Sequence, residues 1–203
     1  VVNEGTNTID EYAFQGCTSL TNISMEEGLK KINRNAFTGC SALESVELPD
    51  SVEYIAYEAF SNCIKLSSIN YPVGWITAGA YSTSYEGYGI DYQGRIFAGC
   101  RSLTKIEVPE GVTIIPDCAF NGSTYLKEVI LPNTLMAIED SVFYGCTGLK
   151  TITLPEGLTK LGNSAFYSCT GLKTIILPDS LTQMENSAFY GCTGLTGIEI
   201  PGG

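Results

Sequence analysis

The sequence predicts a repeat solenoid, in which short parallel β-strands from successive turns stack on one another. All eight phenylalanines fall in one column with a spacing of 23 residues, except between Phe60 and Phe97, where the interval is 37 residues. A leucine follows every phenylalanine six residues later, so the apolar pattern keeps the same period. One insertion of 14 residues, the difference between 37 and 23, accounts for the only irregularity.

Each repeat is expected to form a short strand after its leucine. An isoleucine or valine comes three residues after the leucine and a further apolar residue comes two positions later, as in Leu172, Ile175 and Leu177. This alternation is typical of a strand with one buried face. A unit of 23 residues cannot bury a core alone, so each column must stack on the same column of the neighbouring repeats.

A proline and a turn follow the predicted strand. Proline occupies this position in seven of the eight repeats, with Glu26 as the exception. Because proline has no N–H to donate, it marks the point where strand pairing stops. Two residues after each phenylalanine, a column of glycine, asparagine or serine indicates a backbone angle that few other residues tolerate.

The combined pattern, L-x-x-I-x-L-P followed by A-F-x-G-C, resembles the BspA-like, or Treponema pallidum-type, leucine-rich repeat family. Residues 172–178 and 188–192 match it well, whereas Ile96 and Val142 replace the usual alanine and Ser123 replaces the cysteine. The resemblance covers the chain apart from the insertion. It implies a leucine-rich-repeat, horseshoe-like right-handed superhelix with one parallel β-sheet of short strands and little α-helix. It also implies a secreted or cell-surface bacterial protein, of a kind often implicated in adhesion to host matrix proteins or other cells.

The composition and the repeat organisation indicate the number of domains and exclude several classes of partner. We expect a single domain over residues 1–203 with about eight repeats, because each repeat shares its core with the next and no linker divides them. The net charge of −11 argues against partners such as nucleic acid or an anionic membrane surface. No apolar run is long enough for direct membrane insertion. Neither end has the polar capping repeat of a finished solenoid, so we expect a fragment of a longer protein.

Seven of the eight cysteines lie in one column, three residues after phenylalanine, and Cys118 lies outside it. Neighbouring members of the column would lie about 5 Å apart, within disulfide range. We nevertheless expect free thiols, buried as small apolar groups and weak donors. Ser123 supports this interpretation, because a hydroxyl could keep the donor but could never form a disulfide. The lack of C-x-x-C pairs argues against zinc.

The sequence predicts a protein that is not an enzyme. It contains no histidine, the commonest general base, and none of the common nucleophile, phosphate-loop, dinucleotide or metalloprotease motifs. An acidic column follows the proline column but matches no calcium loop, and we interpret it as solvated turn residues. The members of this column are Glu27, Asp50, Glu110, Glu156 and Asp179. We therefore expect no catalytic residue, no metal site and no cofactor.

The outward residues of the strands form the default binding surface of a solenoid. Most of them are small and polar here, with Lys127, Lys150 and Lys173 along one edge of the strands and the acidic column along the other. The candidate partner-binding residues on this face are Ser45, Glu47, Lys105, Glu107, Glu128, Ile130, Thr151, Thr153, Thr174 and Ile176.

The insertion, within residues 73–93, is a sharper candidate site than the strand residues. It holds the only tryptophan together with tyrosines among glycine and serine, a composition similar to that of antibody paratopes. Alternatively, the segment folds back and its aromatic side chains cover the solenoid, since closing a longer loop costs little. The candidate binding residues are Trp75, Tyr81, Tyr85, Tyr88 and Tyr92.

These observations favour a protein-interaction or adhesion module of a secreted or cell-surface bacterial protein. The expected partner is a protein, such as a host matrix protein or another surface protein. Carbohydrate binding through the aromatic insertion and a structural spacer role remain open alternatives. Fold transfers through a family resemblance better than function does.

Overall fold

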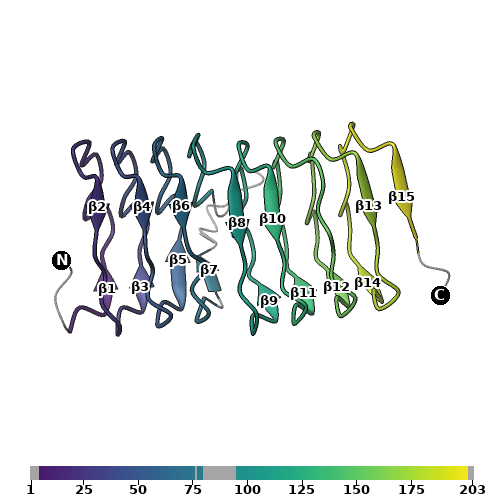
Figure 1. Ribbon diagram of the computed structural model, residues 1–203, viewed down its shortest axis with the longest axis horizontal. Helices are drawn as coiled ribbons and strands as arrows, with labels where there is room; N and C mark the ends of the chain where they lie inside the picture. The colour runs from purple at the N-terminus through teal and green to yellow at the C-terminus, as the bar shows by residue number, and fades with distance from the viewer. Residues whose placement is uncertain (1–4, 76, 80–94, 201–203) are drawn as a thin grey trace, which may run out of the picture.

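The computed structural model describes residues 5–75, 77–79 and 95–200. Its turns lie side by side in an elongated row, with β1 (Thr8–Ile9) at one end and β15 (Gly197–Glu199) at the other (Figure 1). The described residues contain no α-helix, and therefore none long and apolar enough to cross a membrane. The predicted solenoid of parallel strands is confirmed.

The first strand ladder is built by the L-x-x-I-x-L pattern. Its strands are β2 (Asn22–Ile23), β4 (Ser45–Val46), β6 (Ser68–Ile69), β8 (Lys105–Glu107), β10 (Glu128–Ile130), β13 (Thr174–Ile176) and β15. Strands β2, β4 and β6 pair in one group, β8 pairs with β10, and β13 pairs with β15. All pairs are parallel, and partners such as Asn22 and Ser45 occupy the same position in successive repeats.

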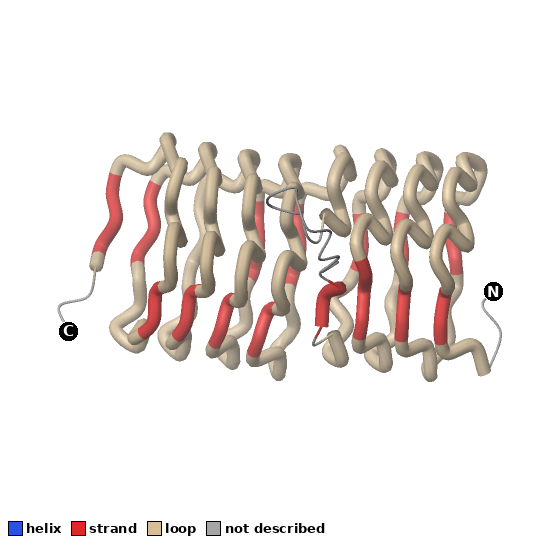
Figure 2. Tube along the Cα trace, turned by 180° about the vertical axis from the view of Figure 1, so that it is seen from behind, coloured by secondary structure: helices blue, strands red, loops and turns tan. Residues whose placement is uncertain are grey.

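A second ladder follows the proline turn and lies on the opposite side of the solenoid from the first, so that it faces the viewer in Figure 2. Its strands are β1, β3 (Lys31–Ile32), β5 (Tyr54–Ala56), β7 (Thr77–Gly79), β9 (Ile114–Ile115), β11 (Ala137–Ile138), β12 (Lys160–Leu161) and β14 (Gln183–Met184). The structure thus has two ladders where one sheet was predicted. Most of these strands are two residues long, too short for an alternating pattern to reveal them.

The phenylalanine column forms a continuous stack through the core. Phe37 and Phe60 lie 5.0 Å apart between ring centroids, and the stack continues across the irregular interval, where Phe60 and Phe97 are 5.9 Å apart. The leucine and isoleucine columns are buried around it, for example at Leu43 and Ile55. The insertion therefore leaves the core unbroken.

Trp75 belongs to this core and not to an exposed loop. It occupies the column of Val52, its side chain is 2% exposed, and its ring lies 4.9 Å from that of Tyr71. Strand β7 pairs with β5 in the regular register, so the period continues to Gly79 and resumes at Arg95. The prediction that Trp75 is an exposed binding residue is therefore wrong, because the residue fills a core column that precedes the insertion.

The predicted backbone requirement two residues after phenylalanine is confirmed. Gly39 has a φ of 74° in this column, and the non-glycine members Asn62 and Ser168 also adopt left-handed angles, of 57° and 55°. A second left-handed column lies two residues before phenylalanine. Cys118, which lies outside the cysteine column, belongs to this second column and has a φ of 59°.

The cysteine column forms a ladder of thiol hydrogen bonds. Cys63 donates to the carbonyl oxygen of Phe37 at 3.2 Å, and Cys169 donates to that of Phe143 at 3.0 Å. All eight cysteines are free, and most are buried. Burial raises the pKa of the Cys146 thiol to about 12. A thiol held protonated in this way is a poor nucleophile and a stable donor.

Ser123 does not keep the donor role that the sequence suggested. Its Oγ is buried and, within the described part of the chain, makes no hydrogen bond. Because the Cβ–Oγ bond of serine is shorter than the Cβ–Sγ bond of cysteine, a hydroxyl at this position has less reach than the thiols of the column. A buried polar atom without a partner costs about 1–3 kcal/mol.

We therefore expect Ser123→Cys to raise the free energy of unfolding by about 1–2 kcal/mol, since it restores the missing thiol donor. Ser123→Ala, which removes the unpaired hydroxyl without adding a donor, should give a smaller gain. Urea denaturation followed by circular dichroism measures both variants against the wild type. A Ser123→Cys variant less stable than the wild type would contradict this explanation.

Candidate functional site

The predicted outward strand residues do lie together on one face of the first ladder. In strand β10, Glu128 and Ile130 are exposed whereas Val129 between them is buried, and β13 repeats this pattern. The in-register pairing places Lys105 beside Glu128 and Glu107 beside Ile130. We call the following exposed residues the strand face: Ser45, Glu47, Lys105, Glu107, Glu128, Ile130, Thr151, Thr153, Thr174 and Ile176.

The first ladder opens at residues 151–153. This segment lies between β10 and β13 but is not a strand, and among the described residues its backbone makes no hydrogen bond to either neighbour. The same turn stays attached at the second ladder, where β12 pairs with both β11 and β14. The opening is therefore confined to the strand face, where it leaves backbone N–H and C=O groups without a protein partner.

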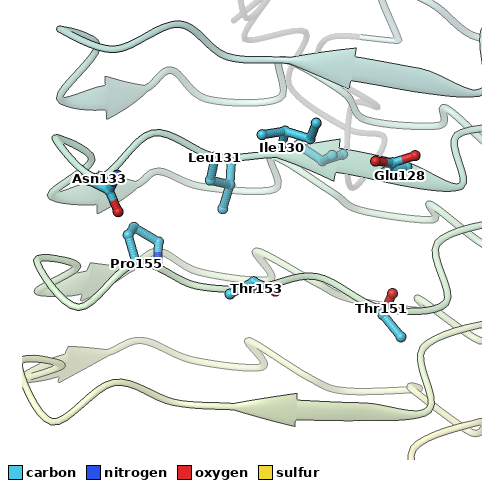
Figure 3. A pocket seen from close by; sticks show the side chains of 8 residues that line it. Glu128, Ile130, Leu131, Asn133, Thr151, Thr153 and Pro155 are labelled. Atoms are coloured by element: carbon cyan, nitrogen blue, oxygen red, sulfur yellow. The ribbon is translucent and has the colours of Figure 1, made fainter.

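A groove lies on each side of the open segment. One groove has a volume of about 370 Å³ and runs between β10 and residues 151–155 (Figure 3). The other, of about 270 Å³, runs between that segment and β13. The exposed side chains of Ile130 and Ile176, which are 37% and 64% exposed, stand at the two grooves. Apolar side chains beside unpaired backbone groups are suited to binding another polypeptide.

The charge on the strand face is partly compensated within it. Lys105 and Glu128 form an ion pair of 3.5 Å between neighbouring strands. Both side chains are about half exposed, so this pair contributes little to stability. The carboxylate of Glu128 is therefore paired with a lysine of the same face.

Three carboxylates of the acidic column at the far edge of the strands, those of Glu27, Asp50 and Glu110, cap the next turn. The backbone N–H of Asp50 donates to Glu27 Oε1 at 3.2 Å, and Asn133 N–H donates to Glu110 Oε1 at 3.1 Å. These carboxylates thus accept hydrogen bonds from the turn that follows each of them. Their repetition is explained by turn geometry and needs no bound cation.

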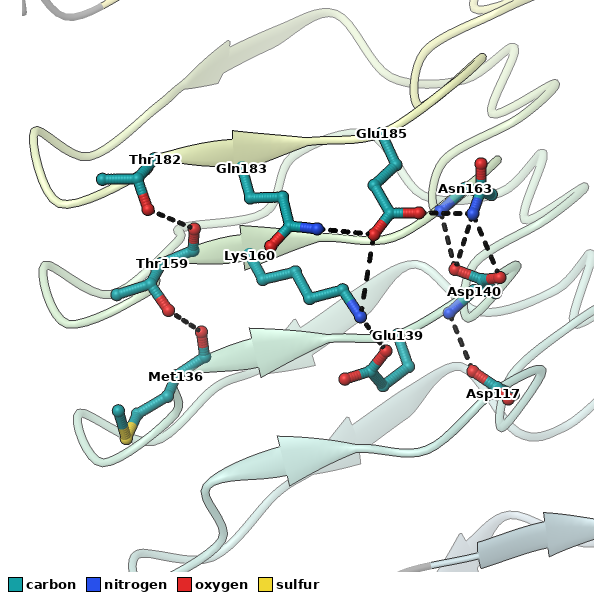
Figure 4. Close-up of polar contacts among 10 residues, drawn as sticks. All are labelled: Asp117, Met136, Glu139, Asp140, Thr159, Lys160, Asn163, Thr182, Gln183 and Glu185. Atoms are coloured by element: carbon teal, nitrogen blue, oxygen red, sulfur yellow. Dashed lines mark hydrogen bonds and ion pairs between the residues drawn. The ribbon is translucent and has the colours of Figure 1, made fainter.

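A polar cluster on the second ladder escaped the sequence analysis (Figure 4). Lys160 binds Glu139 and Glu185, and these contacts raise the pKa of the Lys160 ammonium, the hydrogen bond that it donates to Glu139 being the main cause. Asn163 donates to Asp140, whose own N–H donates to Asp117 at 2.9 Å. The sequence does contain one signal that could have revealed this cluster, because its polar residues Asp117, Asp140 and Asn163 recur every 23 residues.

Within the described residues, Asp117, Glu139 and Asp140 are the acidic group whose oxygens lie close enough together, within 4.8 Å, to hold a cation. Lys160 and Asn163 already provide donors to two of these carboxylates. Burial raises the pKa of the Asp117 carboxyl, which disfavours the charged form that a cation would need. The cluster is accounted for by the stacking of turns, and we assign it no metal.

A family model described as BspA type leucine rich repeat region (6 copies) matches residues 1–86 and 92–203. The chain belongs to this family. The resemblance seen in the repeat pattern is thereby confirmed. Proteins built from leucine-rich repeats of this type are generally non-enzymatic scaffolds.

Solved structures show the same BspA-type architecture. A leucine-rich repeat protein from Bacteroides ovatus is 28% identical over 97% of this chain and 53% of its own, with a TM-score of 0.65. The T. pallidum leucine rich repeat protein is 26% identical over 78% of this chain and 59% of its own, with a TM-score of 0.53. A leucine rich cell surface protein from Faecalibacterium prausnitzii, 24% identical over 97% of this chain and 70% of its own, shares the fold with a TM-score of 0.52.

The chain spans between half and three fifths of the length of the first two of these proteins. No curated protein matches it significantly. Of the sequence-predicted residues in the insertion, Trp75 is buried, and Tyr81, Tyr85, Tyr88 and Tyr92 lie outside the described residues. The strand face is therefore the candidate site that this BspA-type structure supports.

Proposed function

We propose that this chain is a protein-interaction module of a secreted or cell-surface bacterial protein, where it serves in adhesion. Its binding surface is the strand face from β8 to β13. The observation that carries the proposal is the opening of the first ladder at residues 151–153, flanked by two grooves with exposed isoleucines. The cell-surface description of the Faecalibacterium prausnitzii protein, which shares the fold, supports the location.

The partner supplies what the open segment lacks. Unpaired N–H and C=O groups at residues 151–153 are solvated in the free protein, and a polypeptide can replace that water with its own donors and acceptors. Ile130 and Ile176 provide apolar contacts, each worth about 1.5–3 kcal/mol when fully buried. Two anchors around a polar centre give the combination of affinity and orientation that protein interfaces need.

The test compares aspartate substitutions at exposed isoleucines on the two ladders. We first identify the host matrix proteins that the wild type binds. Ile130→Asp and Ile176→Asp should each lower the affinity for these proteins about tenfold or more, because a charge replaces a buried apolar contact. Ile114→Asp is the matched control, since Ile114 is 45% exposed but lies on the second ladder. Surface plasmon resonance against a panel of immobilised matrix proteins measures all four proteins.

Two outcomes would overturn the proposal. One is that no matrix or bacterial surface protein binds the wild type. The other is that Ile130→Asp and Ile176→Asp bind as tightly as Ile114→Asp, which would place the interaction elsewhere on the chain.

A further inference from the structure

A row of three lysines borders the grooves of the strand face. Lys127, Lys150 and Lys173 are exposed and occupy the same position in successive repeats. The N–H of Lys173 donates to the carbonyl oxygen of Lys150 at 3.0 Å, so these lysines lie on adjacent turns. We call them the lysine row. In the part of the chain that the structure describes, none of the three forms an ion pair or a side-chain hydrogen bond.

The lysine row differs from the other cationic side chains of the described residues. Lys30, Lys105 and Lys160 each have a carboxylate within reach, at Glu53, Glu128 and Glu139 respectively. Other exposed cations without an ion pair, such as Lys31, Lys65 and Arg101, stand in different columns and form no row. In a chain with 22 acidic and 11 basic residues, three aligned and uncompensated lysines are a local reversal of sign.

The position of the row links it to the grooves. Each lysine immediately precedes a residue of the strand face, so the row runs along the edge where the strands begin. The adjacent carboxylate of Glu128 is engaged with Lys105. The acidic column lies beyond the other end of the strands, where the carboxylates of Glu27, Asp50 and Glu110 accept backbone hydrogen bonds. An occupant of the grooves would thus have ammonium groups along one side only.

We propose that the strand face selects an extended, acidic polypeptide segment, with its carboxylates at the lysine row and its apolar side chains in the two grooves. This inference rests on the proposed function and adds the chemistry of the partner. The net charge of −11 opposes an acidic partner at long range. At physiological ionic strength the screening length is about 8 Å, so the nearby lysines determine the interaction at contact.

A polypeptide fits this surface better than a sulfated polysaccharide does. A polysaccharide would use the lysine row alone, whereas the open backbone at residues 151–153 and the exposed Ile130 and Ile176 match peptide groups and apolar side chains. Paired contacts of this kind are typical of extended peptides bound beside strands. Binding of a sulfated polysaccharide is therefore the alternative that the experiment must exclude.

The experiment selects partners without assuming their sequence. A random peptide library displayed on phage is selected against the wild type, against the triple variant Lys127→Gln/Lys150→Gln/Lys173→Gln, and against the matched control Lys31→Gln/Lys65→Gln/Arg101→Gln. Both variants lose three positive charges, so they differ only in where the charges are removed. Circular dichroism spectra establish that both remain folded, and heparin binding is measured in parallel.

We expect the wild type and the matched control to enrich acidic peptides that also carry apolar residues. A synthetic peptide from this set should bind the triple variant about tenfold more weakly, since three exposed ion pairs contribute about 0.2–1 kcal/mol each. Added salt should weaken binding to the wild type and leave the residual binding of the triple variant nearly unchanged.

Three outcomes would overturn the inference: enrichment of neutral or basic peptides, equal binding of the acidic peptides by the triple variant, or heparin binding through the lysine row without enrichment of acidic peptides. The proposed function fails separately. If neutral peptides are enriched and Ile130→Asp abolishes their binding, the strand face is a protein-binding surface but its preference for acidic partners is disproved. If neither peptides nor matrix proteins bind, both proposals fall.

Discussion

Phe143→Ala lowers the free energy of unfolding by about 3–5 kcal/mol, the usual cost of truncating a fully buried aromatic side chain. Phe143 is 0% exposed and its ring lies 5.6 Å from Phe120 and 5.1 Å from Phe166, so it is held between rings of the two adjacent turns. The backbone of these turns is fixed by two ladders and by the hydrogen bond from Phe143 N–H to Ala165 O. The cavity therefore cannot collapse, and the full cost should appear.

The Phe143→Ala substitution should also reduce the cooperativity of unfolding. In a solenoid each turn contacts only its neighbours, so stability depends on the interfaces between successive turns. Removing the ring of Phe143 weakens both of its interfaces at once, and we expect a broader denaturant transition as the two halves unfold less concertedly.

Urea denaturation followed by far-ultraviolet circular dichroism tests the substitution, with Tyr144→Ala as the matched control. Tyr144 stacks on Tyr167 at 4.6 Å but is only partly buried, so its truncation should cost clearly less than that of Phe143. Equal losses for the two variants would show that the phenylalanine column does not dominate the core.

Gly171→Ala is the second substitution with a large expected effect, although it adds only one methyl group. A Cβ at this position would lie 2.3 Å from the carbonyl oxygen of Thr147 and 2.9 Å from that of Leu149. Both oxygens belong to the backbone of the preceding turn, which cannot move without separating the turns. Overpacking of this kind costs about 1–3 kcal/mol, and more where the backbone cannot adjust.

Gly157→Ala is the control for this substitution. Its Cβ would lie 3.4 Å from the nearest atom, the carbonyl oxygen of Asn133, which is an ordinary contact. Replacing glycine by alanine also restricts the unfolded chain, so this variant should be neutral or gain up to about 1 kcal/mol. Thermal unfolding of both proteins measures the difference, and a Gly171→Ala variant as stable as Gly157→Ala would contradict the close approach of the turns.

Periodicity made the fold predictable because the residues with the strongest stacking requirement recur without exception. Phe14 to Phe189 and the leucines that follow them lie in single columns, and the structure stacks them as the pattern requires. The second ladder was not predicted, since strands such as Lys160–Leu161 are too short to show alternation. Trp75 was misassigned because tryptophan differs in size and type from the leucines and valines that occupy most other positions of its column.

The candidate site was only partly accessible to sequence reasoning. Alternation correctly predicted that residues such as Glu128 and Ile130 are exposed. The opening of the ladder was not predictable, because residues 151–153 have the same alternating pattern as the paired strand Lys105–Glu107. The difference lies in backbone hydrogen bonds, which side-chain patterns do not record. The Ser123 hydroxyl was likewise chemically able to donate but lacks the reach of a thiol.

Native-state hydrogen exchange measured by nuclear magnetic resonance tests the opening of the first ladder most directly. The amides of Thr151 and Thr153 should exchange much faster than the ladder amides of strands β10 and β13, because exchange is slowed by hydrogen bonds that only the paired strands make. Strand β12, from the same turn, should be protected, since it pairs on both sides. Protection of residues 151–153 equal to that of β10 and β13 would show that the ladder is closed there, and the proposed binding surface would lose its basis.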